Sequence, residues 1–186
     1  DKWGDLWVGS YSGGVDLAMP MEHTLEFVKH EYLNPQSLID NSVNDILQSR
    51  DGKIWYATDK GVSVYDEQAH LWHHGLNGKV ALTLCQTRSN RILVGTYGNG
   101  VYEVSSNGNA TQVYSLANGS LKTDYVYSLF CDSEDDLWIG CLDGDLVHVA
   151  ASGRNGSAST RRYLPIKEVQ CIEESPDHRY MDVGTS

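Results

Sequence analysis

The sequence lacks any long run of apolar residues. Its apolar runs are short, such as Ile92–Val94 and Val80–Leu82, whereas a helix that crosses a bilayer needs roughly 20 consecutive apolar residues. We therefore expect no membrane contact by these residues. The first residue is Asp1, and neither a basic region nor an apolar core follows it. This start predicts that any signal peptide was removed or not included.

Basic residues are also scarce. The chain has 14 Lys and Arg against 25 Asp and Glu, a formal net charge of −11. Such a negative field repels phosphate backbones, because binding to nucleic acid depends on basic side chains that release counterions. The composition therefore predicts that nucleic acid is not a partner.

Motifs for catalysis and cofactors are missing as well. The sequence has no Ser-His-Asp arrangement, P-loop or dinucleotide fingerprint, so we expect no cofactor and no catalytic residues. The histidines His70, His73 and His74 would point to opposite faces of a strand, which argues against a metal site. The acidic run Glu134–Asp136 is interpreted as an exposed, solvated turn rather than an acid pair for glycoside hydrolysis.

The cysteines do not form a C-x-x-C pair. Cys85, Cys131, Cys141 and Cys171 each lie in an apolar, strand-like stretch. A free cysteine in such a stretch behaves as a small hydrophobic residue. We therefore expect four buried thiols, and the cysteines alone do not identify the compartment.

No window has the spacing of an amphipathic helix, but a repeat is present. The segment Asp5–Ser10 recurs four times, and the small residue of each copy is Gly9, Ala57, Gly95, Gly140 or Gly184. Copies about 44 residues apart suit a blade of four strands. In the second copy the expected strands are Val43–Gln48, Ile54–Thr58, Gly61–Tyr65 and Ala69–His74, with Asp51-Gly52 as a hairpin turn.

The sequence thus predicts an all-β fold, a single β-propeller fragment over residues 1–186 with four to five blades of four antiparallel strands. The expected repeats are 1–33, 34–76, 77–117, 118–164 and 165–186, of which the first and last are partial. Trp7, Trp55 and Trp138 occupy one repeat position. Their indoles are expected to fill the space between neighbouring blades.

The copies resemble the two-component regulator propeller repeats of periplasmic sensor regions in hybrid two-component histidine kinases of Bacteroidetes. The resemblance rests on Asn41–Ile46, Ser49–Thr58 and Gly61–Asp66, and on the glycine-rich segments Gly9–Val15 and Gly95–Val101. It implies a periplasmic segment of a sensor anchored in the inner membrane, which recognises a glycan fragment or relays a signal to other domains. The parent protein would then be a histidine kinase. A propeller lyase or hydrolase and a protein-interaction scaffold remain alternatives.

The ligand face of a blade is expected where loops between the second and third strands meet the connections between blades. Exposed aromatic rings and planar polar groups there suit sugar rings and hydroxyls. The candidate ligand-binding residues, for an oligosaccharide or another small ligand, are Tyr11, Asp59, Tyr97, Asn99, Asp143 and Tyr125. An ordinary solvated loop is the alternative for each.

The second-strand pattern occurs at both ends, at Asp5–Ser10 and Tyr180–Thr185. A closed ring has no place for both copies, so we expect the chain to be part of a longer protein. Open strand edges recruit other chains. We therefore expect self-association through the terminal blades, or poor order there. Other blades or domains of the parent protein are further expected partners.

Overall fold

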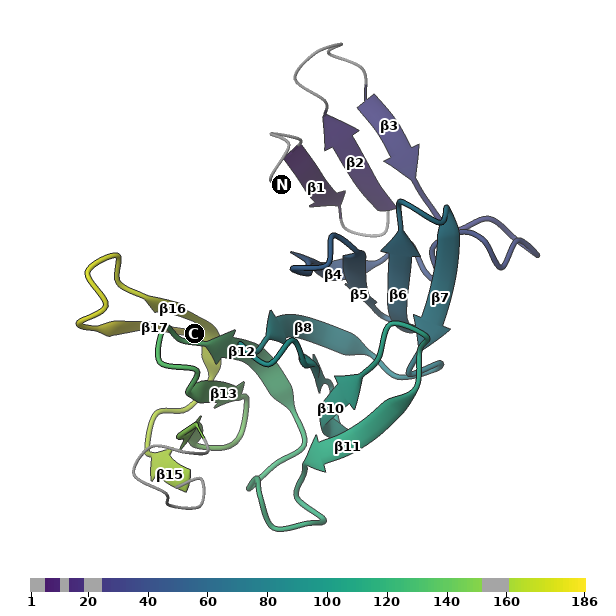
Figure 1. The fold of residues 1–186 in the computed structure, drawn as a ribbon. Coiled ribbons are helices and arrows are strands. Elements are labelled where there is room, and N and C mark those ends of the chain that lie inside the picture. Colours follow the sequence, from purple (N-terminus) through teal and green to yellow (C-terminus); the bar gives the residue numbers. More distant parts are fainter. Residues whose placement is uncertain (1–5, 11–13, 19–24, 152–160) are drawn as a thin grey trace. The chain divides into compact units, whose positions relative to one another are not determined.

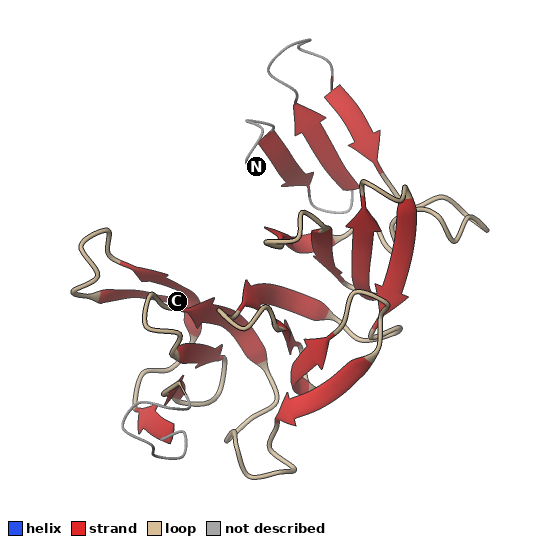
Figure 2. Ribbon diagram, viewed as in Figure 1, coloured by secondary structure: helices blue, strands red, loops and turns tan. Residues whose placement is uncertain are grey.

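The structure is a computed structural model that describes residues 6–10, 14–18, 25–151 and 161–186. Every regular element in these residues is a β-strand (Figure 2). None of the described residues forms a helix that could cross a membrane. The predicted all-β class is confirmed.

The chain divides into two compact units, the first with residues 1–81 and 105–110 and the second with 82–104 and 111–186. In the first unit, one antiparallel sheet consists of β1 (Leu6–Ser10), β2 (Gly14–Ala18) and β3 (Leu25–Val28) (Figure 1). A four-stranded antiparallel sheet follows, with β4 (Val43–Gln48), β5 (Ile54–Thr58), β6 (Gly61–Asp66) and β7 (Leu71–Gly75).

The second unit contains three sheets. The two outer strands of its first sheet, β8 and β11, begin at Ala81 and Ala110, which are the last residues of the two ranges of the first unit. The first sheet consists of β8 (Ala81–Gln86), β9 (Ile92–Thr96), β10 (Gly100–Val104) and β11 (Ala110–Tyr114). The next consists of β12 (Val126–Cys131), β13 (Leu137–Cys141), β14 (Leu146–Val149) and β15 (Arg161–Leu164), and the last of β16 (Val169–Glu174) and β17 (Met181–Thr185). Four-stranded sheets of consecutive strands are the predicted propeller blades.

The turn between the first two strands has the same construction in four sheets. At β4–β5, the Ser49 amide donates to the Lys53 carbonyl at 2.9 Å, and the Gly52 amide donates to the Ser49 carbonyl at 2.8 Å. Thr87 and Asp132 begin turns with the same spacing, and Ser175 begins one that is a residue longer and closes at the Tyr180 carbonyl. The residue with positive φ is Gly52 in one turn and Asn90, Asp135 or His178 in the others. The backbone conformation of the turn is therefore kept even in the repeats that have no glycine at this position.

The apolar core lies between successive sheets within each unit. In the first unit Val15 of β2 packs with Ile54 and Tyr56 of β5. In the second unit one cluster joins β9 and β10 to β12–β14, and another joins β13 and β14 to β16. Strands β5 and β9 are buried along their whole length, as expected for strands with both faces covered.

The tryptophans support the predicted core role where they are described. Trp55 is 2% exposed, and its indole N–H donates to the Ser49 hydroxyl at 3.1 Å. Trp138 is half-buried in the cluster that joins its sheet to β16 and β17. The side chain of Trp7 lies outside the described residues.

Two expectations about buried and exposed side chains are wrong. Cys171 is exposed, because the β16–β17 sheet is covered on one face and burial in β16 is limited to Val169 and Ile172. Cys131, at the end of β12, is only half-buried. Asp136 is 6% exposed rather than solvated. Its carboxylate turns inward, where it meets His148 Nε2 at 2.8 Å and accepts from the Ala151 amide at 2.8 Å.

The fourth strand of the second sheet begins two residues later than predicted, at Leu71. The Asp66 carboxylate accepts from the amides of Gln68 and Ala69, both at 3.0 Å, and His70 has a φ of 52°. A side chain that bonds its own following backbone favours a turn over a strand.

Candidate functional site

The predicted ligand residues fall in different parts of the chain. Tyr11 lies outside the described residues. Asp59 lies in the first unit, whereas Tyr97, Asn99, Tyr125 and Asp143 lie in the second. Asp59 is exposed at the β5–β6 turn, where Oδ1 accepts from the Asn44 side chain at 2.9 Å.

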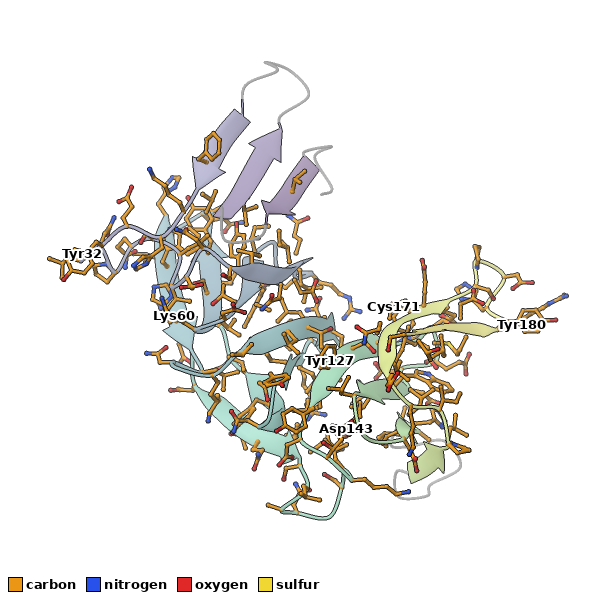
Figure 3. The ribbon with its side chains drawn as sticks, turned by 180° about the vertical axis from the view of Figure 1, so that it is seen from behind. Tyr32, Lys60, Tyr127, Asp143, Cys171 and Tyr180 are labelled. Atoms are coloured by element: carbon orange, nitrogen blue, oxygen red, sulfur yellow. The ribbon has the colours of Figure 1, made fainter. Side chains whose placement is uncertain are left out.

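Three tyrosines gather in the second unit, and we refer to Tyr97, Tyr125 and Tyr127 as the tyrosine cluster. The rings of Tyr97 and Tyr125 meet edge to face, with centroids 4.8 Å apart, and Tyr127 lies 6.2 Å from Tyr97. Tyr97 is 47% exposed and Tyr125 is 37% exposed. Tyr97 and Tyr125 are two of the candidate ligand residues named from the sequence, whereas Tyr127, which is labelled in Figure 3, was not among them.

The backbone around the tyrosine cluster is held firmly. The amides of Gly98 and Gly100 both donate to the Asp124 carbonyl, at 3.0 and 2.9 Å. Gly100 has a φ of 71°, and a Cβ there would collide with the Tyr114 carbonyl. Only glycine fits this close approach, which fixes the loop that carries Tyr97 beside Tyr125.

Asn99 and Asp143 lie in two different turns of the same unit, β9–β10 and β13–β14. The Asn99 carbonyl accepts from the Gln112 side chain at 2.8 Å. Asp143 is exposed at the β13–β14 turn (Figure 3). The tyrosine cluster is therefore an exposed aromatic patch, a form that suits a flat partner better than an enclosed small ligand.

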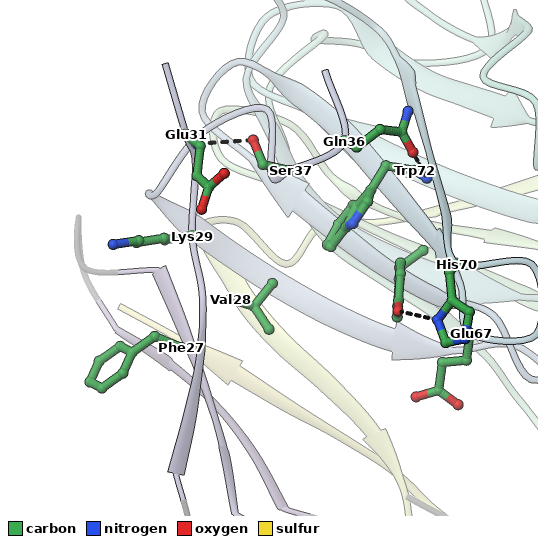
Figure 4. Close-up of a pocket in the computed structure, with 10 residues that line it drawn as sticks. Phe27, Val28, Lys29, Glu31, Gln36, Ser37, Glu67, His70 and Trp72 are labelled. Carbon is green, nitrogen blue, oxygen red and sulfur yellow. Dashed lines mark hydrogen bonds between the residues drawn. The ribbon is translucent and has the colours of Figure 1, made fainter. Parts of the chain in front are cut away.

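The sequence missed a concave site in the first unit, which we call the Trp72 groove (Figure 4). It has a volume of about 420 Å³, within the range of roughly 300–1,000 Å³ for ligand pockets. Its lining residues come from the end of β3, the segment that follows it, and β6–β7: Phe27, Val28, Lys29, Glu31, Gln36, Ser37, Tyr65, Glu67, His70 and Trp72.

Aromatic rings form the apolar part of the groove. The Trp72 ring packs against Tyr56 with centroids 5.6 Å apart and against Tyr65 at 4.8 Å. Burial raises the pKa of the Tyr56 phenol, and the nearby Glu67 and Tyr65 act in the same direction. The phenol stays neutral at ordinary pH, so it can lie beneath the indole without a charge. Phe27 is 69% exposed at the opposite side of the groove.

The rim is polar and carries both signs of charge. Lys29, Glu31 and His70 are exposed, and Glu67 is half-buried. The Tyr65 hydroxyl lies 3.3 Å from His70 Nδ1. These groups offer several donors and acceptors around an aromatic surface.

The rim is attached to the sheet by hydrogen bonds. The Trp72 amide donates to Gln36 Oε1 at 3.0 Å, and the Glu31 amide donates to the Ser37 hydroxyl at 2.9 Å. His74 Nε2 lies 3.0 Å from the Pro35 carbonyl. Hydrogen bonds thus hold the segment 29–37 against β7, and the shape of the groove is set by contacts within the chain.

The histidines near β7 contact different residues. His70, in the turn before β7, lies beside the Tyr65 hydroxyl, and His74 of β7 lies beside the Pro35 carbonyl. Among the described residues, no group of three or more His, Cys, Asp or Glu side chains is placed to hold a metal ion.

One signal in the sequence could have indicated the groove. Trp72 is the second residue of an outer strand, where β11 has Thr111. The core that the repeats share does not require an aromatic residue at this position of the outer strand, because another repeat has threonine there. The partners of Trp72, Phe27 and Gln36, are far away in the sequence, so spacing alone does not bring them together.

Comparison with known families finds the repeat in two places. Residues 37–60 and 120–143 match the model described as two component regulator propeller. These segments contain the first two strands of the second and fourth sheets. A search of curated proteins finds no significant match.

Several solved structures share the fold. The extracellular domain of a B. thetaiotaomicron protein described as a one component system aligns with a TM-score of 0.75 at 16% identity, over 100% of this chain and 28% of that one. The extracellular domain of a B. thetaiotaomicron hybrid two component system aligns with a TM-score of 0.56 at 16% identity, over 97% and 30%. The chain spans less than a third of either domain.

An enzyme has a similar fold too. A catalytically inactive virginiamycin B lyase from Staphylococcus aureus, solved with quinupristin, aligns with a TM-score of 0.64 at 13% identity, over 91% of this chain and 56% of that one. At these identities the likeness concerns the fold alone. The match of the family model is independent of it, and residues 37–60 and 120–143 are therefore two component regulator propeller repeats.

Proposed function

We propose that this chain is a non-catalytic sensor segment, located outside the cytoplasm, that binds a neutral carbohydrate fragment in the Trp72 groove. The regulator repeats support a role in signalling. The observation that carries the ligand class is the aromatic surface of Trp72 inside a groove of about 420 Å³ with a polar rim. Sugar rings stack their C–H faces on such rings, and their hydroxyls bond to mixed donors and acceptors.

Charge favours a neutral sugar over an acidic one. Lys29 is the one basic side chain of the lining besides His70, and Glu31 and Glu67 are both acidic. The chain carries a net charge of −11, which repels an anionic ligand at a distance. Uronic acids and sulfated sugars should therefore bind more weakly than neutral oligosaccharides.

Binding by the purified protein tests this proposal. Isothermal titration calorimetry with neutral gluco-, manno- and xylo-oligosaccharides should detect binding by at least one, and oligogalacturonides should bind less tightly. Trp72→Ala should weaken binding about tenfold or more, because the stacking surface is lost. If Trp72→Ala does not fold, Lys29→Ala provides a second test, because it changes only an exposed rim residue. Weaker sugar binding is the expected result.

A variant in the tyrosine cluster is the matched control. Tyr97→Ala should leave sugar affinity unchanged, since the cluster lies in the other unit. If Tyr97→Ala abolished binding and Trp72→Ala did not, the ligand site would be the tyrosine cluster. If none of the oligosaccharides bound, the carbohydrate proposal would be wrong.

The absence of catalysis needs its own measurement. Incubation with the same sugars and with polysaccharides should release no new reducing ends or unsaturated products, with or without a chelator. Turnover that depends on a groove residue would make the chain a propeller enzyme.

The tyrosine cluster favours a second role, as a contact surface for a protein. Exposed tyrosines are enriched at interfaces, where one ring supplies both apolar area and a hydroxyl. Another domain of the parent protein is the proposed partner. Cross-linking of the longer protein, with Tyr97→Ala and Tyr125→Ala as variants, tests this role separately from sugar binding.

A further inference from the structure

Two cysteines from neighbouring sheets of the second unit lie unusually close. The Sγ atoms of Cys85 and Cys131 are 2.9 Å apart, although the residues are 46 positions apart in the sequence. Atoms the size of carbon are at their optimal non-bonded separation at about 3.5–4.0 Å, and sulfur is larger. The disulfide bond length is about 2.03–2.05 Å. The two sulfurs are therefore nearer than a relaxed contact and need little movement to bond.

A second contact fixes the same strand register independently. The Leu129 amide donates to the Thr83 hydroxyl at 3.2 Å, and these residues are also 46 positions apart. Each lies two residues before a cysteine of the pair. Residues two apart on a strand share a face, so the contact that joins β8 to β12 at Thr83 also brings Cys85 opposite Cys131.

We propose that Cys85 and Cys131 form a disulfide that cross-links the β8–β11 sheet to the β12–β15 sheet. The oxidant is a disulfide donor, either a small-molecule disulfide such as oxidised glutathione or the active-site disulfide of a thiol oxidoreductase. Structural disulfides persist outside the cytoplasm, so the cross-link in the cell depends on the proposed location. Its formation in purified protein depends neither on that location nor on sugar binding.

The chemistry is thiol–disulfide exchange in two steps. The thiolate of Cys131, the more exposed of the two, attacks the donor disulfide and forms a mixed disulfide, with release of one donor thiol. The thiolate of Cys85 then attacks the Cys131 sulfur and releases the second donor thiol. Two S–H bonds break and one S–S bond forms, while the donor disulfide takes up the two electrons and the two protons.

The other cysteines provide internal controls. Cys141 is 1% exposed, and burial, together with Asp124 and Asp145, raises the pKa of its thiol to about 12. It is therefore protonated and unreactive near neutral pH. Cys171 is exposed on β16. It should react with an alkylating reagent without forming the cross-link.

Peptide mapping of the wild-type protein tests the proposal directly. The protein is treated with oxidised glutathione, denatured, alkylated with iodoacetamide and digested without reductant. Mass spectrometry should find a linked pair of peptides that contain Cys85 and Cys131, 2 Da lighter than the two thiol peptides combined. Four alkylated cysteines, a link that includes Cys171, or a glutathione adduct that stays on Cys131 would overturn the proposal.

Stability provides a second readout. The oxidised protein should unfold roughly 5–15 °C higher than the reduced protein, because the cross-link restricts the unfolded chain. Cys131→Ser should abolish both the linked peptides and this difference, and Cys171→Ser should retain both. Cys131 is only half-buried, so its serine variant avoids the larger packing defect expected for Cys85→Ser. A redox-independent unfolding temperature in the wild type would contradict a cross-link in the native fold.

Discussion

The two matched repeats, residues 37–60 and 120–143, share a hydrogen-bonded frame. In each, the second-strand tryptophan donates its indole N–H to a side chain six residues earlier, Trp55 to Ser49 at 3.1 Å and Trp138 to Asp132 Oδ2 at 2.8 Å. In each, that earlier residue begins the same turn. The sequence motif thus specifies how the hairpin closes.

The packing around this frame differs between the two repeats. Trp55 is 2% exposed, whereas Trp138 is half-buried and lies 4.3 Å from the His148 ring, which in turn meets Asp136. The small residue of the motif is Ala57 in one repeat and Gly140 in the other. The repeat therefore determines local geometry, and the neighbouring sheet determines which side chains that geometry can hold.

The largest expected difference concerns the tryptophans. Trp55→Ala should lower the free energy of unfolding by about 3–5 kcal/mol, because it leaves a cavity in a closed core. Trp138→Ala should cost about 2 kcal/mol, since less of its surface is buried. Urea denaturation measures both. A loss below about 1 kcal/mol for Trp55→Ala, or a larger loss for Trp138→Ala, would contradict the assigned packing.

The small residue of the motif gives the next contrast. A Cβ on Gly140 would lie 2.6 Å from Val169 Cγ1 and would also collide with the Ser128 hydroxyl. Gly140→Ala should therefore cost about 2–3 kcal/mol. Ala57→Gly has no clash and should cost about 1 kcal/mol through chain flexibility. Equal losses in thermal or urea unfolding would mean that the β16 side of Gly140 is not packed as described.

The turn position with positive φ should show a smaller effect. Gly52 has a φ of 88°, so Gly52→Ala should cost about 1 kcal/mol. Gly52→Asn should cost about half as much, because asparagine tolerates this region. Asn90 already occupies the equivalent position at a φ of 64°. The comparison fails if alanine and asparagine are equivalent in chemical denaturation.

The smallest effect depends on pH. Partial burial raises the pKa of Asp51, but hydrogen bonds from Lys53 and Ser49 outweigh it and hold the pKa below its usual range. The charged form is favoured in the folded state, so its contribution is present above about pH 4 and is lost as pH falls through the folded pKa. Asp51 is largely exposed, which limits the contribution to a few tenths of a kcal/mol.

Denaturation of wild type and Asp51→Asn between pH 2 and 7 measures this contribution. The two proteins should differ above about pH 4 and converge in acid. The difference should shrink in about 1 M salt, because exposed charges are screened. A difference that grows as the pH falls would reverse the expected sign.

Features contained within one repeat could be predicted from the sequence. The bounds of β4 and β5 agree with the expectation, because the motif contains both strands and the turn between them. The neighbouring positions of Tyr97 and Tyr125 were also accessible, since one follows a second strand and the other precedes a first strand. These features depend on residues that the repeat keeps at fixed spacing.

The remaining features depend on contacts that the repeat does not determine. The Trp72 groove joins Phe27, Gln36 and Trp72, which belong to different segments. The burial of Asp136 depends on His148 and on the Ala151 amide. The exposure of Cys171 reflects a sheet covered on one face. Periodicity identifies a strand, but it does not identify which face of that strand another segment covers.

Each described sheet is made of strands that follow one another in the chain. Every pairing is a hairpin closed over a short distance, so little entropy is lost before a contact forms. Chains with such local pairing fold faster than those that must join distant strands. At a synthesis rate of about 5–20 residues per second, each sheet has seconds to form after its last strand leaves the ribosome. We expect folding to proceed from the amino terminus, and within each unit a finished sheet offers its apolar face as the template for the next.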